Sequence, residues 1–318
     1  MVSQTYLLHQ IPVTFHAGDA FLADRLDVYW RAFRADDVGR AQPIQVHLHV
    51  TDAPPQPPDA DPFSAGPEVS YYRTAETLTV FFPAGGRFDM ALEGDTIRGW
   101  MARDAADAYG VFEDMILIAL KPMLRRRGYY TIHAFAAAVG DRSLLILGES
   151  GAGKTTTGLS LLARGARLLA NDAPLLHLDA KTRLLLHAYP GLISAYPDSL
   201  ARFAELTPLL RDIPPDKRGK IAFAVEDVWP GAWAWQAQPA ALVFPHITPG
   251  LTESSLEPMT AFGALQRLIG QSIEDWDEPT IPAQLRMLRH LVSVAPAYYL
   301  HLAPDIPALP DLLLPLVE

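Results

Sequence analysis

Alternating hydrophobic and polar positions mark the first hundred residues and predict strands. The segment "IQVHLHV" (residues 44–50) has an apolar side chain at every second position, which is typical of a strand with one buried face. The run "TLTVFFP" (residues 77–83) is rich in β-branched and aromatic residues. The proline-rich segment 53–67 between them is predicted to be a surface loop. We therefore expect a smaller, strand-rich α/β domain of unassigned role over residues 1–98.

Helical spacing replaces this alternation in residues 104–127. Apolar side chains recur there at steps of three and four, which predicts an amphipathic helix. Pro122 lies inside the stretch and predicts a kink. The arginines at 125–127 suit the negative end of the helix dipole, and Gly128 is suited to follow the last turn. The apolar positions are Tyr109, Phe112, Ile116, Leu120 and Met123.

Strand and helix patterns alternate in the next segment. The runs "YYTIHAFAAAV" (129–139) and "SLLILG" (143–148) are separated by a short turn and predict two neighbouring strands. After a glycine-rich stretch, residues 155–165 predict a helix that ends at Gly165, and "ARLLA" (166–170) predicts a further strand. This order indicates a second, α/β domain over residues 99–318.

The composition limits the classes of function. The 318 residues are 49% hydrophobic and 19% charged, as in an ordinary globular chain. The absence of cysteine excludes disulfides, thiolate nucleophiles and cysteine-bound metals. A net charge of −10 without a basic block argues against a nucleic-acid partner. The first fifteen residues lack a signal-peptide pattern, and the apolar stretch 111–124 is interrupted by charges, so we expect no membrane span and a cytoplasmic location.

The segment "GESGAGKT" (residues 148–155) has the spacing G-x-x-x-x-G-K-[ST] of a phosphate-binding loop. Its glycines let backbone amides converge on phosphate oxygens, and the following helix presents its positive end to the same anion. Lys154 is predicted to reach the β- and γ-phosphates, and Thr155 to place its hydroxyl on Mg²⁺. ATP and Mg²⁺ are the expected cofactors, although no motif separates ATP from GTP. The predicted nucleotide-binding residues are Gly148, Ser150, Gly151, Ala152, Gly153, Lys154, Thr155 and Thr156.

Two polar residues, Asn171 and Asp172, follow the strand predicted at 166–170. Ligands gather at the carboxyl ends of strands in open α/β sheets. An acidic side chain at that edge can hold Mg²⁺ or orient a nucleophile, which makes Asp172 a candidate metal ligand and catalytic residue. The other interpretation is an Asn-Asp pair that begins a turn. A basic group, Lys217, Arg218 and Lys220, is either a phosphate contact or a solvated turn.

Residues 132–172, "IHAFAAAVGDRSLLILGESGAGKTTTGLSLLARGARLLAND", resemble the catalytic domain of bacterial HPr kinase/phosphorylase and its related proteins. That group shares its fold with ATP-dependent phosphoenolpyruvate carboxykinase. The shared pattern has a histidine before the first strand, the glycine loop, a helix ending in Arg-Gly, and an acidic pair after the next strand. Here these features are His133, residues 148–155, Arg164-Gly165 and Asn171-Asp172. Weaker similarity extends the resemblance over roughly residues 100–318.

The resemblance implies roles for individual residues. Lys154 and the loop amides would bind the triphosphate, Thr155 and Asp172 would hold Mg²⁺, and His133 would lie near the phosphates. Asn171 occupies the position of the family's first Asp, the acid/base for the acceptor hydroxyl. An amide cannot take a proton at neutral pH, and general-base assistance is worth roughly 10²–10⁴ in rate. The catalytic candidates are therefore Asp172, Asn171, His133 and Lys154.

Two hypotheses follow from the sequence. The first is an ATP- and Mg²⁺-dependent kinase that phosphorylates a hydroxyl of a peptide, protein or small molecule. The second is a non-catalytic, nucleotide-binding regulatory module, in which Asn171 marks a degenerate active site. In both, a nucleoside triphosphate is a partner, and the resembled kinases suggest a homo-oligomer. The acceptor is not determined by the sequence.

Overall fold

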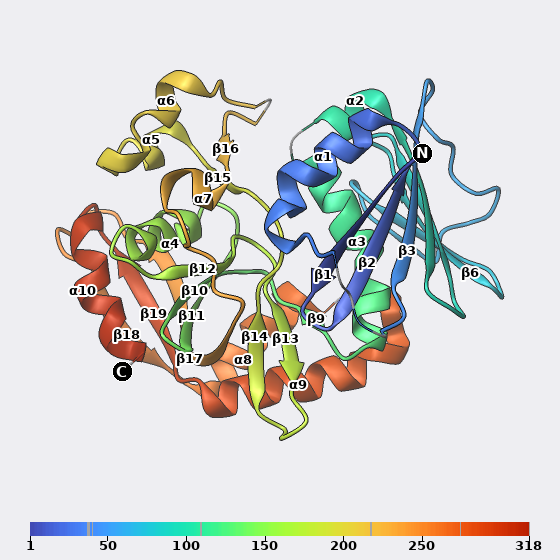
Figure 1. Cartoon of the computed structure of the whole chain (residues 1–318). Helices are drawn as coiled ribbons and strands as arrows, with labels where there is room; N and C mark the ends of the chain where they lie inside the picture. The colour runs from blue at the N-terminus through green and yellow to red at the C-terminus, as the bar shows by residue number, and fades with distance from the viewer. Residues whose placement is uncertain (37–38, 40, 109, 217, 274, 318) are drawn as a thin grey trace. The chain divides into compact units, whose positions relative to one another are not determined.

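The computed structural model describes residues 1–36, 39, 41–108, 110–216, 218–273 and 275–317. The chain is a mixed α/β protein, as predicted (Figure 1). It divides into two compact units, Met1–Arg127 and Gly128–Glu318. The sequence placed the boundary after residue 98, which lies within strand β8 of the first unit.

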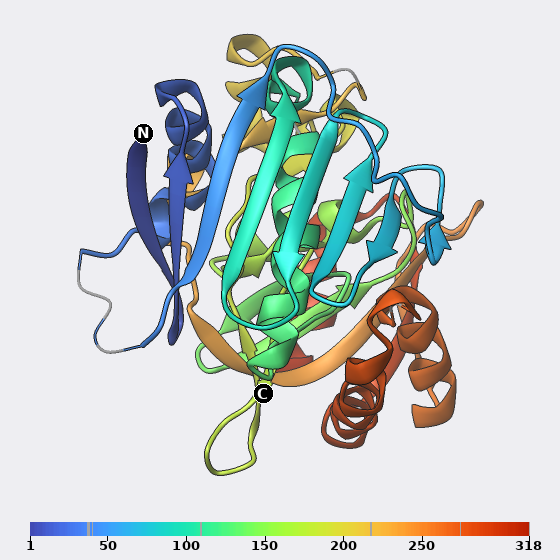
Figure 2. The same cartoon turned by 90° about the vertical axis from the view of Figure 1, so that its right-hand side faces the viewer.

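The first unit is built on an eight-stranded sheet, which Figure 2 shows face on. Its strand order is β1-β2-β3-β8-β7-β6-β5-β4, and only the β2–β3 and β3–β8 pairs are parallel. The strands predicted at 44–50 and 77–83 are confirmed as β3 and β6. The bounds are β1 (Val2–Leu8), β2 (Ile11–Ala17), β3 (Ile44–Thr51), β4 (Ser64–Ala65), β5 (Ser70–Arg73), β6 (Thr77–Phe82), β7 (Gly86–Ala91) and β8 (Thr96–Ala102).

Alternate side chains of this sheet form the core of the first unit. Tyr6 and Phe15 are fully buried, and the ring of Trp30 lies against both, with centroids 5.5 and 5.1 Å away. Trp30 ends helix α1 (Ala20–Trp30), so this aromatic cluster fixes α1 to the sheet. Edge-to-face aromatic pairs of this kind add to the free energy gained from burial alone.

The helix predicted over residues 104–127 is two helices, α2 (Arg103–Asp107) and α3 (Val111–Arg126). The interruption lies at Gly110, whose φ of 77° is incompatible with a continuous helix. Tyr109, predicted as an apolar helix position, lies outside the described residues. Helix α3 continues through Pro122, and Gly128 follows its end with a φ of 80°.

Helix α3 explains why the first unit extends to Arg127. Strand β8 is an inner strand between β3 and β7, so a boundary at residue 98 would cut the sheet. The buried side of α3 packs in the same unit: Phe112 stacks on Tyr29 of α1 with centroids 5.7 Å apart, and α3 contacts β7. The amphipathic pattern correctly indicated a helix but not the sheet that it covers.

The second unit contains a nine-stranded sheet and a small two-stranded sheet, β15-β16. The main path is β12-β10-β11-β17-β14-β13-β9, and β19 joins β17 beside β14, with β18 outside it. The bounds are β9 (Tyr130–Thr131), β10 (Ala134–Val139), β11 (Arg142–Leu147), β12 (Arg167–Ala170), β13 (Leu175–Leu178), β14 (Leu184–His187), β15 (Ile193–Ala195), β16 (Ile221–Phe223), β17 (Gln236–Ile247), β18 (Ser255–Met259) and β19 (Ala297–Leu302).

Strand β17 lies at the centre of this sheet and is buried over most of its length. It pairs in parallel with β11 on one side and, in its second half, with β19 on the other. Helix α4 packs against β10 and β11, and α9 contacts β17. The helices are α4 (Lys154–Leu162), α5 (Pro197–Leu200), α6 (Leu209–Asp212), α7 (Val225–Val228), α8 (Ala261–Ser272), α9 (Ile281–Val294) and α10 (Leu309–Leu313).

No helix in the described parts of the chain combines the length and apolarity needed to cross a bilayer.

A buried carboxyl in the first unit makes its stability depend on pH. Burial raises the pKa of Glu113 from its ordinary 4.5 to about 7, although hydrogen bonds, including one from the Gly110 amide at 2.7 Å, act in the opposite direction. Between these two values the folded state holds a proton that the unfolded state releases. The free energy of unfolding therefore falls as the pH rises from about 4.5 to 7.

We expect Glu113→Gln to remove this dependence, since the amide is neutral throughout. Above pH 7 the variant should be more stable than the wild type by up to about 3 kcal/mol, because one pKa unit corresponds to about 1.4 kcal/mol. Urea unfolding between pH 4.5 and 8 measures the effect. Glu93→Gln, at an exposed position of the same unit, is the matched control. Parallel stability curves for wild type and Glu113→Gln would contradict the prediction.

Candidate functional site

The glycine-rich segment 148–153 connects β11 to α4. Gly153 is the N-cap of α4 and has a φ of 103°, a left-handed conformation that favours glycine. A Cβ at this position would also lie only 2.7 Å from Cδ2 of Leu302. Glycine has no side chain that could accept the first-turn amides, so these N–H groups are available to a ligand in front of the helix. This geometry suits an anion.

Helix α4 is held against the sheet at Gly158. A Cβ on Gly158 would lie 2.3 Å from Cε1 of Phe135, a fully buried residue of β10. The aromatic ring therefore occupies the space that a side chain at 158 would need. This close approach sets the distance between helix and sheet, and hence the position of the first turn beside the glycine segment.

Lys154 is the first residue of α4, and its side chain folds back over the glycine segment. Only 8% of the residue is exposed, and Nζ donates hydrogen bonds to the carbonyl oxygens of Gly148 (2.6 Å) and Glu149 (3.1 Å). Burial lowers the pKa of Lys154, and the nearby charge of Lys220 lowers it further, whereas Asp172 and Glu149 act in the opposite direction. A buried cation of this kind is stabilised by an added anion.

The predicted residues Asp172 and His133 lie at the same edge of the sheet as this segment. Ala134, at the start of β10, pairs in register with Leu147, the last residue before the glycines. The Ala134 amide donates to the carbonyl oxygen of Asp172 at 3.1 Å, so His133 and Asp172 belong to adjacent stretches of backbone. Both residues are exposed. The sheet register thus brings together residues that are 39 positions apart in the sequence.

Asn171 is bonded to its neighbour. Its Nδ2 donates a hydrogen bond of 2.6 Å to Oδ2 of Asp172, and its Oδ1 is buried with no hydrogen-bond partner among the described residues. The amide therefore orients the Asp172 carboxylate without supplying a titratable group. An ionised carboxylate at this position would lose the donated bond and meet a like charge.

The three consecutive threonines of α4 have different environments. Thr156 donates from Oγ1 to Oγ of Ser199 at 3.1 Å, which ties α4 to α5. The Thr156 hydroxyl is therefore already hydrogen-bonded, and the group of Thr156 that could bind a phosphate is its backbone amide. Thr157 is fully buried. Thr155 is partly exposed at the start of the helix, the position predicted to meet a metal ion.

The basic residues near 217–220 separate in the structure. Lys217 lies outside the described residues. Arg218 pairs with Asp216 at 3.4 Å, whereas the Nζ of Lys220 lies 5.2 Å from the ring centroid of Tyr196. Lys220 is close enough to lower the pKa of Lys154. Lys220 therefore contributes positive charge near the glycine segment.

Mg²⁺ would find few protein ligands here. Within the described ranges no three His, Asp or Glu side chains gather into a metal site. Mg²⁺ in nucleotide sites is typically bound by one or two protein oxygens, water and the phosphates themselves. The Thr155 hydroxyl and the exposed Asp172 carboxylate fit that pattern, in which the nucleotide supplies the remaining ligands.

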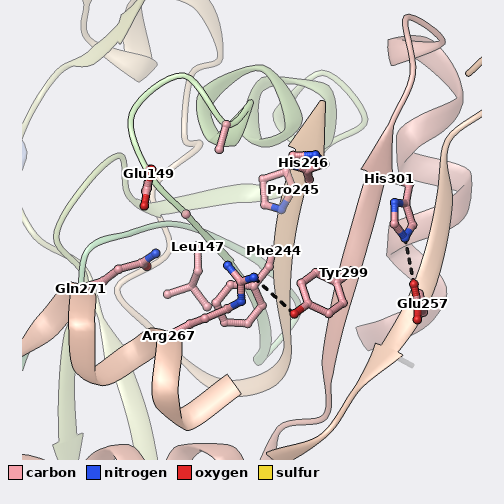
Figure 3. Close-up of a pocket in the computed structure, with 12 residues that line it drawn as sticks. Leu147, Glu149, Phe244, Pro245, His246, Glu257, Arg267, Gln271, Tyr299 and His301 are labelled. Atoms are coloured by element: carbon pink, nitrogen blue, oxygen red, sulfur yellow. Dashed lines mark hydrogen bonds and ion pairs between the residues drawn. The ribbon is translucent and has the colours of Figure 1, made fainter. Parts of the chain in front are cut away.

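A cavity of about 430 Å³ lies beside the glycine segment (Figure 3). Its walls come from the carboxyl ends of β11, β17 and β19, from β18, and from one side of α8. In the close-up, Arg267 and Gln271 extend from α8 toward the strands. The lining residues are Leu147, Gly148, Glu149, Ala152, Phe244, Pro245, His246, Glu257, Arg267, Gln271, Tyr299 and His301.

No motif or residue spacing in the sequence indicated this cavity. His246 had no motif spacing, and Arg267 and Tyr299 stand 32 positions apart. Strands β17 and β19 pair with Phe244 opposite Tyr299 and His246 opposite His301, which brings the lining together. Only this tertiary pairing could have identified these residues.

No protein-family model matches the chain, and no curated protein matches it. Among solved structures, the Hpr(Ser) kinase/phosphatase from Coxiella burnetii aligns with 58% of this chain and 93% of its own, at 15% identity and a TM-score of 0.33. At this level of similarity the match does not place the chain in that family.

The contact between Gly158 and Phe135 can be tested by adding one methyl group. Gly158→Ala should destabilise the protein by about 1–3 kcal/mol, because the ring must move in a packed interior. Gly270→Ala in α8 is the matched control: its Cβ would meet nothing within 4 Å, so helix propensity should stabilise it by up to about 1 kcal/mol. Urea unfolding distinguishes the two. Equal stabilisation in both variants would contradict the packing described.

Proposed function

We propose that the chain is an ATP- and Mg²⁺-dependent kinase that transfers the γ-phosphoryl group to a hydroxyl of a peptide, protein or small molecule. The observation that carries the proposal is the position of Lys154. Its ammonium is buried over a glycine segment that leads into a helix N-terminus, with Asp172 near enough to act on its charge. Phosphoryl transfer depends mainly on positioning and on neutralising charge, and these groups supply both.

Each group has a role in the proposed reaction. The amides of residues 150–156 donate to the α- and β-phosphates, and Lys154 leaves its carbonyl partners to contact the β- and γ-phosphates. Lys220 adds a second positive charge close enough to act on Lys154. Thr155 and Asp172 would hold Mg²⁺, which would supply positive charge to neutralise the charge that develops during transfer. The assignment to ATP follows the resemblance and the loop, not a base-reading motif.

The attacking hydroxyl must lose a proton as it bonds to the γ-phosphorus and the bond to the β-phosphate oxygen breaks. Asn171 cannot accept that proton. His133 and Asp172 are titratable residues on the β10 side of that sheet edge. Because Asp172 is assigned to the metal and accepts a hydrogen bond from Asn171, His133 is the proposed base.

A second candidate function is favoured by Asn171. Its amide binds Asp172, and this arrangement is fully compatible with nucleotide binding in the absence of transfer. In that case the chain is a nucleotide-responsive module rather than a kinase. The two functions share the phosphate site and differ only in chemistry, so binding and transfer must be measured separately.

Nucleotide binding is tested with Lys154→Ala. Removing a charge-assisted contact to phosphate should weaken Mg²⁺–ATP binding on the order of 100-fold. Titration calorimetry gives the dissociation constant, and circular dichroism checks that the variant folds. Lys181→Ala, an exposed lysine in the turn after β13, should bind as the wild type does. Equal affinity in Lys154→Ala and the wild type would refute the phosphate site.

Transfer is tested with γ-labelled ATP, Mg²⁺ and a nucleotide-depleted cell extract. We expect label to reach an acceptor, and Asn171→Asp to raise the rate by up to about 10²-fold, since a carboxylate beside Asp172 has a raised pKa and would supply a base in addition to His133. Asn171→Ala, which removes the bond to Asp172 without adding a base, should not gain activity. Intact ATP binding with no transfer by the wild type or by Asn171→Asp would exclude the kinase and favour the regulatory module.

A further inference from the structure

We infer that the cavity between α8 and the ends of β17 and β19 binds the base and ribose of the nucleotide whose phosphates contact the glycine segment. This inference rests on the proposed function. The cavity shares Gly148, Glu149 and Ala152 with the segment itself, so a molecule within it lies in contact with the loop. Its volume, about 430 Å³, falls in the range of small-molecule pockets, roughly 300–1,000 Å³.

The sheet order separates this cavity from the catalytic residues. Strand β11 leads into the glycine segment, with β10 and β12 on one side of it and β17 and β19 on the other. His133 and Asp172 belong to the first side, where the acceptor must reach the γ-phosphate. The cavity belongs to the second side. A nucleotide that spans the segment would therefore have its reacting end near Asp172 and its nucleoside near β17 and β19.

The lining offers flat surfaces for a base. The guanidinium carbon of Arg267 lies 5.0 Å from the ring centroid of Tyr299 and 6.0 Å from that of Phe244. Arg267 also donates a hydrogen bond of 3.3 Å to the Tyr299 hydroxyl, which holds the two side chains together (Figure 3). Planar guanidinium and aromatic groups stack on nucleobases whatever hydrogen-bonding groups the base carries, because every base has a flat π-face.

Polar groups at the rim suit ribose hydroxyls and the edge of a base. Nε2 of His301 and Oε2 of Glu257 are 3.0 Å apart, and Gln271 extends from α8 toward the same space. Two carboxylates, Glu149 and Glu257, offset the single charge of Arg267. An uncharged nucleoside fits this balance better than an anionic acceptor, which two carboxylates would repel.

The experiment separates the nucleoside from the phosphates by comparing two ligands. Titration calorimetry with Mg²⁺ measures the binding of ATP and of inorganic tripolyphosphate to the full chain. The test variants are Arg267→Ala and Tyr299→Leu, and Arg286→Ala on α9 is the matched control, since it is exposed and lines no part of the cavity. Circular dichroism confirms that each variant folds.

We expect Arg267→Ala and Tyr299→Leu each to weaken ATP binding about tenfold or more, as loss of a stacking partner does, and to change tripolyphosphate binding less than twofold. Arg286→Ala should change neither. ATP binding that is unaffected by both test variants, in a protein that still binds tripolyphosphate, would overturn the nucleoside assignment and leave the phosphate site intact. Variants that lower transfer to an acceptor without weakening ATP binding would also overturn the nucleoside assignment. A wild type that binds neither ligand would overturn the proposed function as well.

Discussion

The buried ammonium of Lys154 is the constraint on which the rest of the second unit depends. A cation removed from water requires oxygen atoms around it, and two carbonyl groups of its own loop supply them. Those carbonyls are directed inward because glycines at 148, 151 and 153 adopt backbone conformations that other residues rarely take. The nearby charge of Asp172 stabilises the Lys154 ammonium, but burial and Lys220 still lower the pKa of Lys154. A polyphosphate would complete the balance.

The sheet converts this local feature into a site with two sides. Strand β10 runs antiparallel to β11, so its beginning lies at the same edge as the end of β11. That arrangement places His133 beside the backbone of Asp172 and both near the glycine segment. Parallel pairing of β11, β17 and β19 places their carboxyl ends at that same edge, and the cavity lies among them, on the β17 side of β11. One strand, β11, thus separates the proposed chemistry from the proposed recognition of the nucleoside.

Asn171 shows how a single amide can preserve geometry while changing chemistry. Its Nδ2 fixes the orientation of Asp172, as a second carboxylate could not do at neutral pH without sharing a proton. The pair therefore holds one negative charge instead of two beside Lys154. A site with this charge suits the proposed binding of a nucleotide and metal, and the proposed base, His133, precedes β10 rather than β12.

From the sequence alone, several elements and the loop spacing that supports the proposed phosphate site could be predicted. Local periodicity is set by burial of one face, so β3, β6, β10, β11, α3 and α4 could be predicted from the order of residues, and the motif spacing identified Lys154 because it depends on adjacent positions. The break at Gly110, the boundary at Arg127 and the cavity lined by Arg267 and Tyr299 were decided only by the tertiary structure. Each of these depends on contacts between residues that are distant in the chain. Strand register and helix packing create such contacts, and neither leaves a local pattern in the sequence.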